Sequence, residues 1–351
     1  MSVPITDSLL QRLGWDDGWE AAFAEHRDAG RAPARVAVQH KGAYDLLGEQ
    51  GELRVPAAAR LARADELPAV GDWVALDVER GLVDAVLPRR TAISRKEVWT
   101  VAREQVLAAN VDVAFLVQAL PRDFNTRRLE RYLAMAWESG AQPVVVLTKT
   151  DLVDDVEPWL ADVRLTTLGA CPVVALSAIT GEHVDEIRTF LAGNRTAVLL
   201  GSSGVGKSTL VNTLAGRELL ATRDVREGDH RGRHTTTHRE LLVLPGGGVI
   251  LDTPGMRELH LWDGDLEQTF ADVEQVAAGC RFSDCSHERE PGCAVRAALA
   301  DGTLAADRWQ SYVKLQRELA ALEARRNHLL RSERVREYKI RARATRRKRR
   351  K

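Results

Sequence analysis

Residues 196–210 read TAVLLGSSGVGKSTL, an apolar strand that runs directly into the pattern Gly201-x4-Gly206-Lys207-Ser208. The glycines allow successive backbone N–H groups to turn inward around a phosphate, and the helix that begins here directs its positive end at the same anion. Lys207 adds a positive charge beside the β- and γ-phosphates, and the Ser208 hydroxyl can bind Mg²⁺. The stretch therefore predicts a phosphate-binding loop of nine residues: Gly201, Ser202, Ser203, Gly204, Val205, Gly206, Lys207, Ser208 and Thr209.

A second motif lies upstream, at the end of the apolar stretch VVVLTKTDL. Its four residues are Thr148, Lys149, Thr150 and Asp151. A carboxylate at such a strand end can accept hydrogen bonds from the guanine N1–H and 2-amino group, and adenine lacks that pair of donors. The next apolar strand ends in Ser177 and Ala178, a pair suited to contact the guanine O6 through its backbone. Two base-contacting segments at consecutive strand ends favour guanine over adenine.

A third motif, residues 252–255 (DTPG), follows the strand GGVILD. We expect Asp252 to hold Mg²⁺ through water and the Gly255 N–H to meet the γ-phosphate. The polar segment RGRHTTTH, residues 231–238, predicts a loop that closes on Mg²⁺ and the γ-phosphate through a threonine, with Thr236 or Thr237 favoured.

The residues that would drive hydrolysis are less sharply indicated. Met256 occupies the place where a water-positioning Gln commonly follows such a motif, and its thioether cannot orient water. His234 is the candidate for that task, because an imidazole near its pKa can accept a proton from water or donate one to phosphate. The predicted catalytic set is therefore His234, Lys207 and Thr236.

The order of these motifs is unusual. In ordinary GTPases the phosphate loop comes first and the base-contacting segments come last, whereas here residues 148–151 and 177–178 precede residues 201–208. Apolar strands alternate with helical patterns from about 97 to 263, which predicts an α/β domain with a mainly parallel sheet. The sequence therefore predicts a circularly permuted P-loop GTPase domain over 97–263.

A possible metal site follows this domain. Three of the four cysteines lie close to a histidine in the pattern Cys280-x4-Cys285-x-His287-x5-Cys293. Three thiolates and an imidazole suit Zn²⁺ in a closed tetrahedral site, and four ligands leave no open position for catalysis. We expect one structural zinc ion in a mostly helical domain over 264–330.

The chain before residue 97 has a different pattern of apolar and polar residues. Residues 1–33 predict an N-terminal extension with one short helix around 5–12. Short alternating stretches separated by glycine-containing turns over 34–96 predict a small β-barrel, of the OB type by strand count, with a β-sandwich used only for packing as the alternative.

Composition sets the remaining limits. The 351 residues carry 50 Lys and Arg against 50 Asp and Glu, but residues 331–351 hold 12 basic and 2 acidic residues, a net of +10 on an acidic body. A basic tail of this kind favours contact with RNA or another polyanion, with a merely solvated tail as the alternative. The sequence has no apolar run long enough for a membrane span and no signal peptide pattern, so we expect a cytoplasmic monomer without membrane contact.

Taken together, the motifs TKTD, SA, GSSGVGKST and DTPG in that order, with a preceding β-barrel and a following Cys/His cluster, resemble the RsgA/YjeQ family of small-subunit-dependent GTPases. The resemblance covers about residues 34–300. It implies a factor that binds the small ribosomal subunit and its rRNA, hydrolyses GTP when stimulated by that subunit, and acts late in its maturation. It also implies zinc on Cys280, Cys285, His287 and Cys293.

Two rivals remain on the sequence alone. The first is a nucleotide-dependent RNA-binding module with negligible hydrolysis, supported by Met256. The second is a P-loop ATPase or kinase, for which residues 148–151 would be an ordinary surface loop.

Overall fold

The computed structural model describes residues 8–97, 103–220, 240–252, 269–282, 284–317 and 319–320. The chain divides into two compact units. The first comprises Met1–Ile93 and Val106–Leu259, and the second comprises Ser94–Gln105 and His260–Lys351. Each unit is considered by itself below.

The α/β part of the first unit is built on a sheet with the strand order β10, β9, β8, β11, β13, β12. The first five strands are parallel to their neighbours, and β12 is antiparallel to β13. Near-continuous apolar runs explain the parallel sheet, because both faces of its strands are covered. The bounds are β8 Val113–Ala119, β9 Gln142–Thr148, β10 Val173–Ala175, β11 Thr196–Leu200, β12 Glu240–Val243 and β13 Val249–Asp252.

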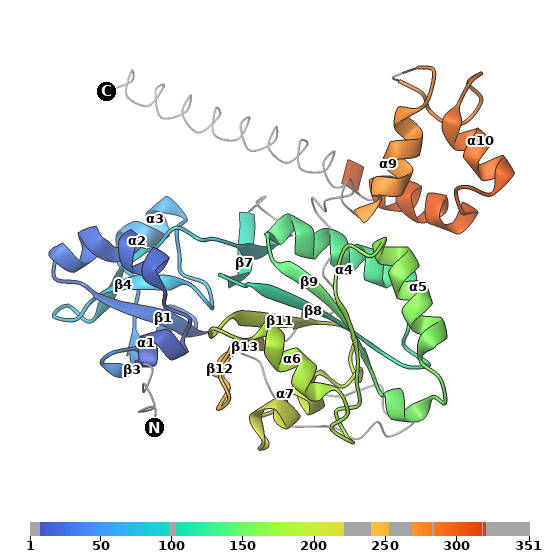
Figure 1. Cartoon of the computed structure of the whole chain (residues 1–351). Coiled ribbons are helices and arrows are strands. Elements are labelled where there is room, and N and C mark those ends of the chain that lie inside the picture. Colours follow the sequence, from blue (N-terminus) through green and yellow to red (C-terminus); the bar gives the residue numbers. More distant parts are fainter. Residues whose placement is uncertain are drawn as a thin grey trace, which may run out of the picture. The chain divides into compact units, whose positions relative to one another are not determined.

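Helices cover both faces of this sheet (Figure 1). Helices α4 (Thr126–Ser139) and α5 (Glu157–Thr167) pack on one face, and α6 (Val184–Phe190) and α7 (Lys207–Ala215) pack on the other. Strand β8 illustrates the two layers, because Leu116 belongs to the apolar core on the α4 side and Phe115 to the core on the α7 side. The carboxyl ends of the parallel strands therefore meet at one edge, where loops can form a site.

The N-terminal part of the first unit is a small barrel. Strand β1 pairs with both β2 and β4, and β4 pairs with β5. A parallel bridge between Ala57, just after β3, and Val83 of β5 closes the circle. The bounds are β1 Ala32–Gln39, β2 Tyr44–Gly48, β3 Gly51–Val55, α3 Ala59–Ala64, β4 Trp73–Asp77 and β5 Leu82–Val86.

The barrel and the α/β sheet share hydrogen-bonded strands. Val38 of β1 pairs with Glu240 of β12, so one 11-stranded sheet runs through both parts. Arg35 of β1 is 1% exposed and donates hydrogen bonds to three carbonyl groups, those of Leu13, Gly71 and Asn110. Because these carbonyls belong to the N-terminal extension, the barrel and the start of the α/β region, this one side chain joins three segments of the chain.

The prediction of a single short helix before the barrel is wrong. Helix α1 (Leu9–Arg12) is followed by a second helix, α2 (Asp17–Asp28). Asp16 caps α2 by accepting a hydrogen bond from the Trp19 N–H at 2.8 Å, and its carboxylate also pairs with Arg90 at 2.6 Å. Trp19 and Phe23 are buried, so contact with the barrel stabilises a helix whose own periodicity is weak.

Strands β6 (Ala92–Glu97) and β7 (Arg103–Ala109) form a two-stranded sheet, of which Ser94–Gln105 belongs to the second unit. The rest of the described second unit is a small helical part. The helical part contains α9 (Ala271–Ala278), α10 (Ala294–Asp301) and a helical stretch over 306–317. Arg308 joins two of these elements through an ion pair with Asp272 at 2.9 Å and lies 4.3 Å above the Phe270 ring. Within the residues described in either unit, no helix is long and apolar enough to cross a membrane.

Candidate nucleotide and metal sites

The loop between β11 and α7 has the geometry of a phosphate cradle. Gly201 approaches β8 so closely that a Cβ atom there would lie 2.4 Å from the Val117 carbonyl oxygen, which excludes any side chain. Gly206 has a φ of 94° and caps α7, whose first residue is Lys207. Ser203 and Gly204 are exposed at the crest, whereas Val205 is buried and anchors the loop. The helix thus presents its N-terminus to a ligand at the crest.

Lys207 lies inside this loop. Its Nζ donates hydrogen bonds to the carbonyl oxygens of Gly201 and Ser202, each at 2.7 Å. Asp252 ends the neighbouring strand β13; burial raises the pKa of its carboxyl, and the positive charge of Lys207 opposes that rise. Ser208 and Thr209 follow on the first turn of α7 and are partly buried. The structure therefore brings a lysine and a carboxylate together at adjacent strand ends, as phosphate and Mg²⁺ binding require.

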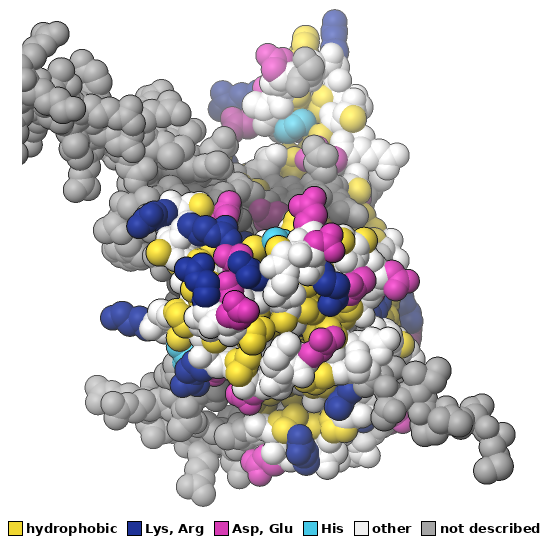
Figure 2. All heavy atoms as spheres, turned by 90° about the vertical axis from the view of Figure 1, so that its left-hand side faces the viewer, with side chains coloured by type: hydrophobic (Ala, Val, Ile, Leu, Met, Phe, Trp, Pro, Cys, Tyr) yellow, Lys and Arg dark blue, Asp and Glu magenta, His cyan; other side chains and the backbone are white. Residues whose placement is uncertain are grey.

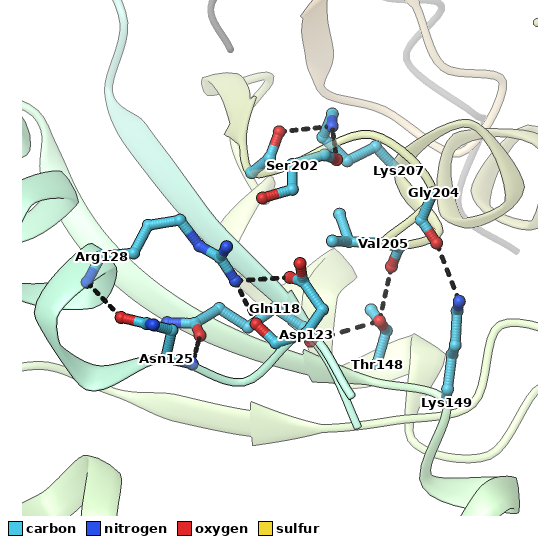
Figure 3. Close-up of polar contacts among 11 residues, drawn as sticks. Gln118, Asp123, Asn125, Arg128, Thr148, Lys149, Ser202, Gly204, Val205 and Lys207 are labelled. Carbon is cyan, nitrogen blue, oxygen red and sulfur yellow. Dashed lines mark hydrogen bonds and ion pairs between the residues drawn. The ribbon is translucent and has the colours of Figure 1, made fainter. Parts of the chain in front are cut away.

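The upstream TKTD segment is bonded directly to the phosphate loop (Figure 3). The Thr148 hydroxyl donates to the Val205 carbonyl at 2.6 Å, and the Lys149 Nζ donates to the Gly204 carbonyl at 2.8 Å. Lys149 adopts a φ of 62°, and the short helix η1 (Thr150–Leu152) follows it. The predicted base-contacting segment and the predicted phosphate loop, which are far apart in sequence, therefore form one site.

The remaining base-contacting residues join the same cluster. The Ser177 hydroxyl donates to the Asp151 carboxylate at 2.6 Å, which fixes the orientation of that carboxylate at the mouth of the site. The Ala178 carbonyl accepts from the Thr213 hydroxyl of α7 at 2.9 Å. Residues 177–178 are thus held between Asp151 and the helix that starts at Lys207.

One group beside the phosphate loop was not predicted. Gln118, near the end of β8, is fully buried, and its Oε1 accepts from the Asn125 N–H at 2.6 Å while its carbonyl oxygen lies 3.3 Å from the Thr148 hydroxyl. Asp123 and Arg128 form an ion pair at 2.7 Å next to it (Figure 3). The sequence carried a signal, since Gln118 is the polar residue in the otherwise apolar run VAFLVQAL, and buried polar side chains are nearly always hydrogen-bonded.

Several predicted residues lie outside the described part of the chain. These are His234, Thr236, Thr237, Gly255 and Met256. The catalytic and γ-phosphate roles assigned to them stay predictions.

The four predicted zinc ligands come together in the second unit. Their ligand atoms all lie within 4.8 Å of one another, and the residues are Cys280, Cys285, His287 and Cys293. The Cys280 and Cys293 sulfurs are 3.9 Å apart, and the His287 Nδ1 lies 3.5 Å and 3.6 Å from them. A tetrahedron with metal–sulfur bonds of about 2.3 Å and a metal–nitrogen bond of about 2.05 Å has edges of roughly 3.8 Å and 3.6 Å. The three distances among Cys280, His287 and Cys293 match these edges, and the Cys285 sulfur lies within 4.8 Å of the other ligand atoms, so the cluster could hold a metal ion.

The sequence was compared with protein-family models and with curated proteins, and both comparisons find GTPases. A family model described as RsgA GTPase matches residues 86–262. The small ribosomal subunit biogenesis GTPase RsgA of Opitutus terrae is 50% identical, with 94% of this chain and 95% of that protein covered. The protein of the same name from Streptomyces coelicolor is 45% identical, with 95% of this chain and 93% of that protein covered.

Two solved structures are similar to most of this chain. The crystal structure of YjeQ from Thermotoga maritima is 27% identical with a TM-score of 0.62, covering 83% of this chain and 99% of that one. YloQ, described as a circularly permuted GTPase, shares the fold at 23% identity with a TM-score of 0.58, covering 83% of this chain and 96% of that one. On these matches the chain belongs to the RsgA GTPase family of GTP-hydrolysing enzymes, and its fold is that of the circularly permuted GTPases.

Proposed function

We propose that this protein binds GTP at the joined TKTD and phosphate-loop site, hydrolyses it to GDP and phosphate, and acts in late maturation of the small ribosomal subunit in the cytoplasm. The observation that carries the proposal is the pair of hydrogen bonds from Thr148 and Lys149 to the phosphate-loop carbonyls. These bonds support the proposal that the base-contacting and phosphate-contacting segments bind one nucleotide.

The choice of guanine rests on Asp151. Its carboxylate is oriented by the Ser177 hydroxyl and offers acceptors that match the guanine N1–H and 2-amino donors. Adenine has no such donor pair, and an unsatisfied polar group costs about 1–3 kcal/mol. The Ala178 backbone would contact O6 from the adjacent strand end.

Two metal ions are part of the proposal. Mg²⁺ would be held by the Ser208 hydroxyl and, through water, by Asp252, and it would neutralise charge that develops on the phosphates. Zinc would be held by the cluster of Cys280, Cys285, His287 and Cys293, because three thiolates suit Zn²⁺ better than the harder divalent cations. With four protein ligands its role would be structural.

The role of the small subunit comes from the relatives, whose names describe small ribosomal subunit biogenesis GTPases. Two features of this chain support contact with rRNA: the basic tail over 331–351, and a barrel whose closing parallel bridge is typical of an OB-type topology. The barrel face itself mixes both charges (Figure 2), since its arginines pair with neighbouring carboxylates, as Arg54 does with Asp45 and Arg60 with Asp84. We therefore assign most of the electrostatic attraction to the tail.

Within this proposal the domain limits are 1–33, 34–96, 97–263, 264–330 and 331–351, and the protein acts as a monomer. Lys207 stabilises the phosphate charge, Thr236 closes on Mg²⁺, and His234 activates water. Position 256 carries Met in place of the water-positioning Gln, which favours slow intrinsic hydrolysis until the small ribosomal subunit completes the site.

Phosphate release with and without purified small subunits tests the proposal. We expect stimulation by orders of magnitude, and we expect Lys207→Ala to abolish it. Guanine nucleotide binding without any stimulation would instead support a nucleotide-dependent RNA-binding module with negligible hydrolysis.

A further inference from the structure

Strand β10 forms one margin of the sheet and pairs with a single neighbour, β9, among the strands that the structure describes. The Pro172 carbonyl accepts from the Val145 N–H at 2.9 Å, and the Leu176 N–H donates to β9 at 2.8 Å. In a parallel ladder alternate residues bond to the same neighbour, so the N–H and C=O groups of Val173 and Ala175 point away from β9. The outer edge of β10 thus offers backbone donors and acceptors to another strand.

A groove of about 880 Å³ runs along this edge. Val173 and Ala175 line it and are partly exposed. Its walls come from η1 and the loop after it, from α5, and from the residues that begin α6. A strand added to a sheet lies about 4.8 Å from its neighbour, so a strand paired with β10 would lie beside Val173 and Ala175, which line the groove.

The charge of the groove indicates which chain would enter it. Four carboxylates line it, those of Asp154, Asp155, Glu182 and Glu186. Two basic side chains also line it: Arg164 pairs with Glu157 at 2.6 Å, and the His183 ring lies 2.8 Å from Glu186 and 3.7 Å from Glu182. Four carboxylates beside one guanidinium that is already paired and one imidazole leave the lining acidic. Such a lining repels the phosphates of nucleic acid and attracts lysine and arginine side chains.

We propose that the free edge of β10 and the acidic groove beside it bind an extended, basic peptide segment of a protein partner as an added strand. Backbone hydrogen bonds to Val173 and Ala175 supply the pairing, and the four carboxylates select basic side chains. The groove shares Thr150 with the TKTD segment, but the edge of β10 and the four carboxylates are not among the residues assigned to the nucleotide. The proposal therefore stands or falls independently of the hydrolysis proposed above.

The test is fluorescence anisotropy with the full-length protein and a labelled peptide of about ten residues that alternates lysine and valine. Ala175→Pro removes an edge donor while leaving the pairing with β9 intact, because proline is tolerated where the N–H faces outward. We expect it to weaken binding at least about tenfold. Glu182→Gln with Glu186→Gln should weaken binding about five- to tenfold and reduce its dependence on salt.

Matched controls separate pairing from charge. Glu49→Gln with Glu52→Gln, on the β2–β3 hairpin of the barrel, removes the same charge elsewhere and should leave binding unchanged. The same peptide N-methylated at alternate residues keeps its charge but cannot pair as a strand, and we expect it not to bind.

Three results would overturn the proposal. The first is no binding of the alternating peptide, or equal binding of its methylated form. The second is that the Glu182→Gln and Glu186→Gln changes alter binding of a labelled single-stranded RNA but not of the peptide. The third is that sedimentation shows two copies of this chain joined at β10, an association that Ala175→Pro abolishes. Thermal melting of each variant verifies that it is folded.

Discussion

Replacing Thr148 with valine tests whether the TKTD segment is fastened to the phosphate loop. Thr148 is 1% exposed, its single hydroxyl proton is donated to the Val205 carbonyl at 2.6 Å, and the Gln118 carbonyl oxygen lies 3.3 Å from the same hydroxyl. Valine keeps the shape but leaves the Val205 carbonyl without that donor. An unsatisfied buried group costs about 1–3 kcal/mol, and the added methyl group recovers part of it. We expect Thr148→Val to lower the free energy of unfolding by about 1–2 kcal/mol.

Thr150 provides a matched control two residues away in the same motif. Its hydroxyl is buried and has no hydrogen-bond partner among the described residues. Thr150→Val therefore removes no interaction, and we expect a change within about 0.5 kcal/mol. The assay is denaturant unfolding followed by tryptophan fluorescence, comparing midpoints at constant slope. Equal midpoints for the two variants, or a lower midpoint for Thr150→Val, would refute the reasoning.

Three further predictions concern the barrel and the metal site. Arg35→Met removes the donor shared by the carbonyls of Leu13, Gly71 and Asn110, of which only that of Gly71 keeps a second side-chain donor, the Asn110 Nδ2 at 3.2 Å. We expect a loss of about 3–5 kcal/mol or failure to fold, measured by thermal melting. The Arg54 guanidinium lowers the pKa of Asp45 to about 2. The stability that ionised Asp45 contributes is therefore present at neutral pH and is lost as the pH falls through that value. Unfolding curves should show that Asp45→Asn is less stable by about 1–2 kcal/mol at neutral pH and that this difference shrinks in acid. Chelation or Cys285→Ser should release about one zinc ion per chain by atomic absorption and unfold residues around 280–293 in hydrogen exchange, whereas Cys171→Ser should release none.

Much of the site was predictable because it depends on local sequence. Position 201 must be glycine because the backbone of the phosphate loop approaches the Val117 carbonyl too closely for any side chain, so the motif itself indicates the loop's conformation. Strands β8, β9, β10, β11 and β13 were predictable because buried parallel strands leave continuous apolar runs, whereas the antiparallel β12 was not predicted. The members of the metal cluster were predictable because all four ligands lie within one short segment of the chain.

What could not be predicted depends on contacts between distant segments. Helix α2 needs Trp19 and Phe23 to pack on the barrel, and its 12 residues show little periodicity on their own. The pairing of Val38 with Glu240 and the three hydrogen bonds of Arg35 join parts of the chain that no local pattern relates. Gln118 could have been noticed as a polar residue in a buried strand, but its partners follow only from the fold.

The most direct test of the central claim is the nucleotide preference of Asp151→Asn. If Asp151 accepts hydrogen bonds from the guanine N1–H and 2-amino group of a nucleotide whose phosphates lie on Lys207, asparagine should weaken GTP binding and favour xanthosine triphosphate, whose 2-oxo group matches the new amide donor. We predict a preference that reverses by at least about a hundredfold in the ratio of the two dissociation constants. A variant that keeps the original preference for GTP would contradict the assignment of both segments to one guanine nucleotide.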